Sequence, residues 1–168
     1  MPILKGNVFL ADDWRYLAPS EVPPPAGKVI LTATRWQELR AEGRAAGSSL
    51  GLHVEPGQDL RIFLPDLVRF GLIVIAFPKF ADGRGYSLAR QIRTHYGYAG
   101  ELRASGEVLF DQLQLLARCG FDSFEITNAA TLRLLEAGRR PMFEIFYQPG
   151  LGPEILEETR PWARRASE

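Results

Sequence analysis

The segment Leu72–Phe77 reads Leu-Ile-Val-Ile-Ala-Phe, and residues 78–86 continue it with Pro-Lys-Phe-Ala-Asp-Gly-Arg-Gly-Tyr. An apolar run this short cannot cross a membrane, and it is typical of a β-strand buried on both faces. The polar residues and glycines that follow predict a loop, and Ser87 is placed to cap the next helix. This order of strand, loop and helix predicts an α/β protein, in which ligand sites commonly lie at such junctions.

Strand and helix patterns alternate on both sides of this segment. Apolar runs predict further strands at 29–32, 52–54, 100–105, 121–126 and 143–147. Helical patterns lie at 34–41, 59–70, 88–96, 107–118 and 128–138, and Pro65 predicts a kink or a late start in the second of these. Successive βα units predict an α/β fold with a mostly parallel sheet. Because a complete eight-fold barrel needs a longer chain, an open doubly wound sheet or a partial barrel is expected.

We expect one α/β domain over residues 28–150. Residues 1–27 are expected to form a peripheral N-terminal segment, with an edge strand at Val8–Leu10, a turn at Ala11–Trp14 and a stiff proline-rich connector. Residues 151–168 are expected to form a charged C-terminal tail.

The composition excludes several functional classes. In 168 residues, 20 Lys and Arg side chains balance 20 Asp and Glu side chains, so no charge excess predicts a nucleic-acid or membrane partner. The single cysteine, Cys119, excludes an intramolecular disulfide and any metal centre built from several thiolates, and no metal site is predicted. Because neither a signal peptide nor a membrane-length apolar run is found, we expect a cytoplasmic protein.

The candidate ligand site lies around the loop after Leu72–Phe77. Gly83 and Gly85 permit positive φ and close backbone approach, and a helix N-terminus beside Arg84 suits an anion. If Arg103 points from its strand end toward this loop, it forms an oxyanion pocket with two further cations, oriented by acidic neighbours. The candidate ligand-binding residues are Lys79, Asp82, Gly83, Arg84, Gly85, Ser87, Arg103 and Glu107.

Other interpretations of these motifs are also open. The loop can be a tight turn held by a salt bridge between Asp82 and Arg84. Its glycine spacing lacks the third glycine of a dinucleotide fingerprint, and no Walker pattern is present. Glu107 and Arg118 are expected on one face of the helix 107–118. Further polar residues at strand ends, Ser105 and Glu125 among them, are expected to be mostly solvated surface.

Three ordered motifs resemble the bacterial family called domain of unknown function 934. They are residues 77–90 (Phe-Pro-Lys-Phe-Ala-Asp-Gly-Arg-Gly-Tyr-Ser-Leu-Ala-Arg), 100–108 (Gly-Glu-Leu-Arg-Ala-Ser-Gly-Glu-Val) and 118–125 (Arg-Cys-Gly-Phe-Asp-Ser-Phe-Glu). The resemblance covers roughly residues 8–150. Ala81 stands where the family more often has Thr or Ser, and Ser105 stands where Val is usual.

The resemblance implies a role in sulfur assimilation, because such proteins tend to be encoded beside assimilatory sulfite reductase and phosphoadenylyl-sulfate reductase. We therefore expect an accessory protein of assimilatory sulfate and sulfite reduction. It would bind an oxyanion or a sulfur-pathway protein, such as sulfite reductase, at the strand-end face. No flavin, nicotinamide, siroheme or cluster motif is present, so the cofactor is unknown.

Two alternative functions stay open, and so does the question whether the protein is an enzyme. One is a small enzyme on a barrel-like scaffold that uses Lys79 with nearby carboxylates. The other is a pure interaction module for sulfite reductase. Aromatic side chains that remain exposed also leave room for a homo-oligomer.

Overall fold

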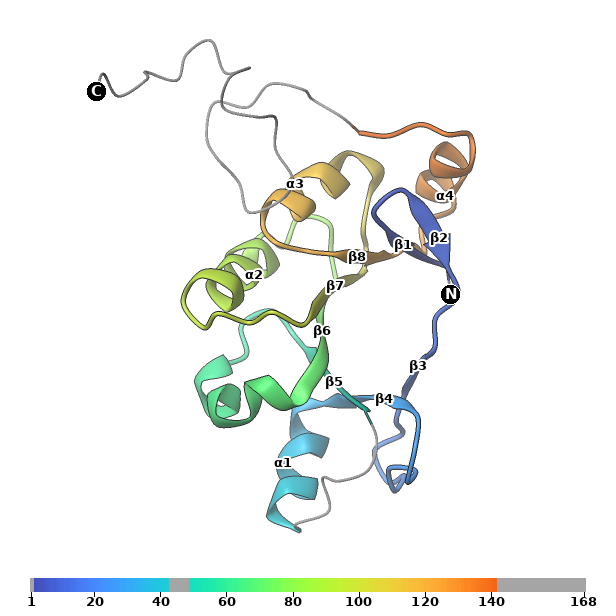
Figure 1. The fold of residues 1–168 in the computed structure, drawn as a ribbon. Coiled ribbons are helices and arrows are strands. Elements are labelled where there is room, and N and C mark those ends of the chain that lie inside the picture. The colour runs from blue at the N-terminus through green and yellow to red at the C-terminus, as the bar shows by residue number, and fades with distance from the viewer. Residues whose placement is uncertain (1, 43–48, 142–168) are drawn as a thin grey trace, which may run out of the picture.

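The computed structural model describes residues 2–42 and 49–141, and Figure 1 shows its ribbon. Eight strands form one sheet in the order β2-β1-β8-β7-β6-β5-β4-β3. Strands β3 to β8 run parallel to one another, and β1 is antiparallel to both of its neighbours. The sheet curls into a half-barrel. The expected mostly parallel α/β fold is therefore confirmed, in its partial-barrel form.

The elements follow one another along the chain as successive strands and helices after an N-terminal group of three strands. They are β1 (Ile3–Lys5), β2 (Val8–Leu10), β3 (Trp14–Tyr16), β4 (Lys28–Thr32), α1 (Ala33–Ala41), β5 (Ser49–Val54), the 3-10 helix η1 (Leu60–Arg69), β6 (Phe70–Phe77), α2 (Arg84–Thr94), β7 (Glu101–Gly106), the 3-10 turn η2 (Phe110–Gln112), α3 (Leu113–Arg118), β8 (Ser123–Glu125) and α4 (Ala129–Glu136).

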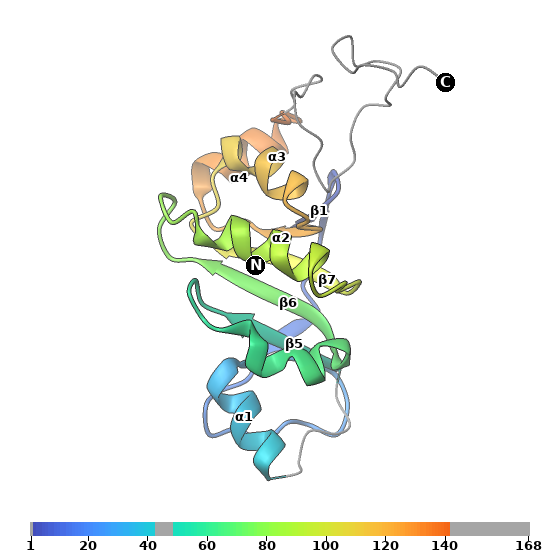
Figure 2. The ribbon, with the colours of Figure 1, turned by 90° about the vertical axis from the view of Figure 1, so that its left-hand side faces the viewer.

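The sheet has an outer face covered by helices and an inner face turned toward the interior of the half-barrel. Figures 1 and 2 show α1, α2 and α3 stacked along the outer face. In β6, Ile73 and Ile75 belong to the large apolar core, whereas Leu72 and Val74 pack with Trp14 in a second, smaller cluster. Because successive strand residues point to opposite faces, β6 contributes to both clusters, as its unbroken apolar sequence predicts.

Residues 8–16 join the two edges of the sheet and are termed the seam segment. β2 lies at one edge and ends at Leu10, and β3 begins at Trp14 on the other edge. At about 4.8 Å per strand, a flat sheet of this width would separate its edges by roughly 34 Å. The link between Leu10 and Trp14 spans at most roughly 14 Å. The sheet must therefore curl until its edges approach each other.

Residues 2–16 contribute three strands to the sheet: β2 is the edge strand expected at Val8–Leu10, whereas β1 and β3 were not predicted. Ile3 and Leu4 are each only 3% exposed, and β1 pairs with β8. Trp14, expected in a turn, begins a strand that pairs with β4. β1 and β3 are three residues long, too short to show a period, and β8, one of the two partners of β1, is more than a hundred residues away in the chain.

Three helices also differ from the sequence prediction. Residues 60–69 form a 3-10 helix with Pro65 inside it. The helix expected over 107–118 begins only at Leu113, after a short 3-10 turn, so Glu107 and Arg118 do not share a helix face. The helix expected from Leu88 begins at Arg84. Asn128 caps α4 as predicted. The strand expected at 143–147 and the tail at 151–168 lie outside the described residues.

Arg103 fixes the seam segment to the sheet across the interior. This β7 side chain is 3% exposed. Its Nη1 donates to Asp12 of the seam segment at 3.0 Å, and its Nη2 donates to Glu101 at 3.1 Å. Glu101 also accepts from Ser123 at 2.7 Å and from Lys5 at 2.8 Å. The network thus joins the seam segment, β1, β7 and β8.

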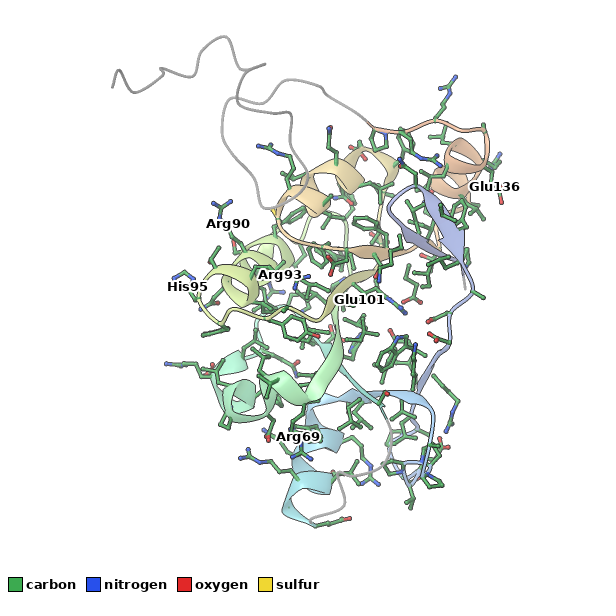
Figure 3. The ribbon with its side chains drawn as sticks, in the orientation of Figure 1. Arg69, Arg90, Arg93, His95, Glu101 and Glu136 are labelled. Carbon is green, nitrogen blue, oxygen red and sulfur yellow. The ribbon has the colours of Figure 1, made fainter. Side chains whose placement is uncertain are left out.

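We predict that Arg103→Met lowers the free energy of unfolding by about 3–5 kcal/mol, because Asp12 and Glu101 then lose their shared buried cation. Urea unfolding followed by circular dichroism measures the change. Arg90→Met on the exposed side of α2 (Figure 3) is the control and should stay within about 0.5 kcal/mol of the wild type. Equal losses in both variants would contradict this structural role of Arg103.

Candidate functional site

The loop between β6 and α2, residues 78–83, is fixed by side chains that follow β7, and is termed the strand-end loop. The Phe80 N–H donates to Glu107 Oε2 at 2.9 Å, and the Phe80 carbonyl accepts from Gln112 Nε2 at 2.9 Å. The Glu107 N–H donates to the Phe77 carbonyl at 2.7 Å. Both polar groups of the Phe80 backbone are thus satisfied, while its side chain leaves the residue 58% exposed.

A salt bridge holds the far side of the strand-end loop, as one interpretation of the sequence proposed. Arg84 Nε and Nη2 donate to the two oxygens of Asp82 at 2.9 and 2.6 Å. These hydrogen bonds from Arg84 lower the pKa of Asp82 to about 2. Arg84 also lies against Gly57 in the neighbouring loop, where an added Cβ would come within 3.0 Å of its Nη1.

Glycines and Ser87 serve different purposes from those predicted. Gly83 has φ of −74° and is the N-cap of α2, with no side-chain cap. Ser87 is therefore not the N-cap; it is an exposed residue inside the helix. An earlier start is favoured because the Asp82 carboxylate accepts from the Arg84 N–H at 3.2 Å. Gly85 permits close packing, since a Cβ there would lie 2.5 Å from the Phe77 ring.

The three predicted cations do not converge. Lys79 is exposed in the strand-end loop, and in the described residues no salt bridge joins it to a carboxylate. Arg84 is paired with Asp82. Arg103 faces the interior of the half-barrel and is paired with acidic residues there, so it does not point toward the loop. Glu107 binds the backbone of the loop through the Phe80 N–H, and in the described residues its side chain forms no hydrogen bond to a cation.

A second polar cluster lies on the inner face, at the carboxyl ends of β7 and β8. Ser105 and Glu125 are 6% and 5% exposed. Tyr16 of β3 lies near both side chains across the interior. His53 packs edge-on against the Tyr16 ring, with ring centroids 5.7 Å apart. Figure 3 labels Glu101, which lies at the amino end of β7, the strand that carries Ser105.

Burial governs the acid–base properties of this cluster. Desolvation raises the pKa of Glu125, and the positive charge of Arg103 opposes that rise. Desolvation, followed by the negative charge of Glu125, raises the pKa of Tyr16 to about 12. Burial lowers the pKa of His53, an effect that Glu55 opposes. The neutral forms of all three side chains are therefore favoured relative to their ordinary behaviour.

This cluster was missed at the sequence level because its members come from distant strands. Tyr16 lies in a strand that no pattern predicted. Ser105 and Glu125 were recognised as strand-end positions but expected to be solvated. A signal does exist: charged or hydroxyl residues occupy alternate positions 101, 103 and 105 of β7 and 123 and 125 of β8. Such a period of two places them all on one face of the sheet.

Neither a metal cluster nor a membrane helix is found in the described part of the chain. Within residues 2–42 and 49–141, no three His, Cys, Asp or Glu side chains gather where they could hold a metal ion. No helix over the same ranges combines the length and apolar character needed to cross a bilayer.

The strand-end loop and the inner cluster thus characterise an α/β half-barrel with polar residues at the carboxyl ends of its strands. A family model described as "Bacterial protein of unknown function (DUF934)" matches residues 51–154, and the chain belongs to this family. No curated protein matches the chain. The matched range contains the strand-end loop, Arg103 and Glu125, whereas Asp12 and Tyr16 lie before it.

We predict that alanine substitution of Gly85 destabilises the protein and that alanine substitution of Gly83 does not. Gly85→Ala should lower the free energy of unfolding by about 1–3 kcal/mol, because its methyl group meets the buried Phe77 ring. Gly83→Ala should stay within about 0.5 kcal/mol of the wild type, because φ is negative and nothing lies within 4 Å of the added Cβ. Thermal and urea unfolding of both variants check the pair; a larger loss for Gly83→Ala contradicts it.

We also predict that Glu125→Gln becomes more stable relative to the wild type as pH rises. Folding raises the pKa of Glu125 above its ordinary value of 4.5. Its contribution to stability is therefore fully present below that value and is lost as pH rises through the folded-state pKa. Gln keeps the shape and does not ionise. Urea unfolding at about pH 4 and about pH 8 measures the free energy of unfolding of Glu125→Gln minus that of the wild type. A value that is lower at the higher pH rejects the prediction.

Proposed function

We propose that this protein is a cytoplasmic accessory protein of sulfate and sulfite assimilation that docks onto assimilatory sulfite reductase through its strand-end loop. The pathway follows from the resemblance stated above. The surface follows from one observation: the Phe80 backbone is fixed by Glu107 and Gln112, while Phe80 itself is 58% exposed. An exposed aromatic side chain on a preorganised backbone favours protein binding, since little conformational entropy is lost on association.

Charge on the strand-end loop supports a protein partner more than a free oxyanion. Arg84 is already neutralised by Asp82, and Arg103 is occupied in the interior. Lys79 then remains as the exposed cation next to Phe80. A single lysine beside an aromatic side chain suits an apolar pocket with an acidic rim, whereas a sulfite or sulfate ion requires several converging donors.

The alternative of a small enzyme based on Lys79 has less support. A catalytic amine is usually desolvated or placed beside a carboxylate that transfers its proton. Lys79 is exposed. Glu107 Oε2 is already engaged, because it accepts a hydrogen bond from the Phe80 N–H. The geometry of the described residues therefore favours docking.

The expected result is that the tagged wild-type protein retains sulfite reductase from the same organism, and that Phe80→Ser weakens this binding at least about tenfold. Phe80→Ser should fold normally, because the side chain is exposed and the fixing contacts are to its backbone. Surface plasmon resonance with purified sulfite reductase measures the dissociation constant, and growth on sulfate compared with cysteine tests the consequence in cells.

Val68→Ser is the matched control, because Val68 is 92% exposed but belongs to η1, which precedes β6. This variant should bind like the wild type. No measurable binding by the wild type, or equal binding by the wild type and Phe80→Ser, overturns the proposal. Calorimetry with sulfite and sulfate tests the anion alternative. A heat of binding in the wild type that is abolished in Lys79→Met would support that alternative.

A further inference from the structure

An apolar groove lies between the turn that joins β1 to β2, helix α3 and the end of α4. Figures 1 and 2 show these elements together at one end of the molecule. The volume of the groove is about 510 Å³, which is in the range of pockets that bind ligands. The apolar side chains in its wall come from both ends of the described chain, and they are Leu4, Leu113, Phe121, Phe124, Leu135 and Pro141.

The chain reaches residue 142 from the wall of this groove. Pro141, the last residue that the structure describes, lines it, and the next Cα atom lies about 3.8 Å from that of Pro141. Arg140 fixes this end of the chain. Its Nε and Nη2 donate to the Asn7 side chain and carbonyl at 3.1 and 3.0 Å, and its Nη1 donates to the Leu135 carbonyl at 2.9 Å. The residues after Pro141 therefore start beside the groove.

The sequence after Pro141 matches the groove in chemistry. Residues 143–147 read Phe-Glu-Ile-Phe-Tyr, so Glu144 is the single charged residue among aromatic and aliphatic ones. The groove has an apolar wall, to which Arg118 and Arg140 add positive charge. In the described residues Arg140 donates to oxygen atoms of neutral groups and pairs with no carboxylate. An apolar segment that carries one carboxylate complements both the wall and its charge.

We propose that this groove is the docking site of residues 143–147 of the same chain. In an extended segment Phe143, Ile145 and Tyr147 share one face. That face packs against the apolar wall, and removal of these side chains from water drives the docking. Glu144 lies at the rim, where the positive charge of the groove favours it. The proposal goes beyond the docking of a partner at the strand-end loop, because it uses none of the residues of that loop.

A segment of the same chain has an advantage over a separate partner in this groove. It is joined covalently to the groove wall at Pro141, and a short link gives it an effective concentration of roughly millimolar at the site. A separate peptide must compete with that concentration. The family match also contains both parts, because residues 51–154 include α3, α4 and residues 143–147. The groove and its occupant therefore belong to the same matched unit.

NMR of the complete 168-residue chain tests the proposal. Nuclear Overhauser contacts should join the Phe143 ring to the methyl groups of Leu113 and Ala117, which line the groove. Ala117→Arg places a charged side chain in the groove and should remove the contacts to Leu113. Leu115→Arg is the matched control and should keep them. Leu115 belongs to the same helix, is 49% exposed and lies outside the groove wall that the described residues form.

Lack of these contacts in the wild type overturns the proposal, and so does their persistence in Ala117→Arg. If Ala117→Arg does not fold, Phe143→Ser takes its place. It should shift the amide signals of Leu113 and Ala117, whereas Ile155→Ser, beyond the segment, should not; unchanged signals in Phe143→Ser contradict docking. A mixture of isotope-labelled and unlabelled chains separates contacts within one chain from contacts between chains. Contacts between chains overturn the proposal, because a second copy then occupies the groove.

Discussion

The short link between opposite edges of the sheet determines the rest of the structure. Leu10 and Trp14 are separated by three residues, yet they belong to strands at the two ends of an eight-strand order. This length permits only a strongly curled sheet, and curling creates an interior. Asp12 lies in the middle of the link and meets Arg103 there. The charged network therefore follows from the connection, because a curled sheet must satisfy the polar groups that it encloses.

The two faces of the sheet consequently have different chemistry. Helices cover the outer face, and its side chains are almost all apolar. The inner face has an apolar part around Trp14 and a polar part around Arg103 and Glu125. The strand-end loop belongs to neither face, because it lies beyond β6 and is fixed by residues that follow β7.

Much of the fold was predictable from sequence, and less of the site. The run Leu72–Phe77 identified a buried parallel strand, since burial on both faces leaves an unbroken apolar signature. β1 and β3 left no such signature, because three residues show no period. The polar residues of the loop could be recognised next to this strand. The environment of Glu125 could not, because its pKa is raised mainly by burial inside the curled sheet.

The pairing of β1 with β8 also sets the order in which the protein can fold during synthesis. Ile3 and Leu4 are synthesised before their β8 partners Glu125 and Phe124, which follow more than a hundred residues later. Until then β1 can pair only with β2. The β4–β7 units can assemble earlier, because each pairs with a neighbour in sequence. The contacts between β1 and β8 are therefore among the last native contacts to form, and closure of the interior is a late, high-contact-order step.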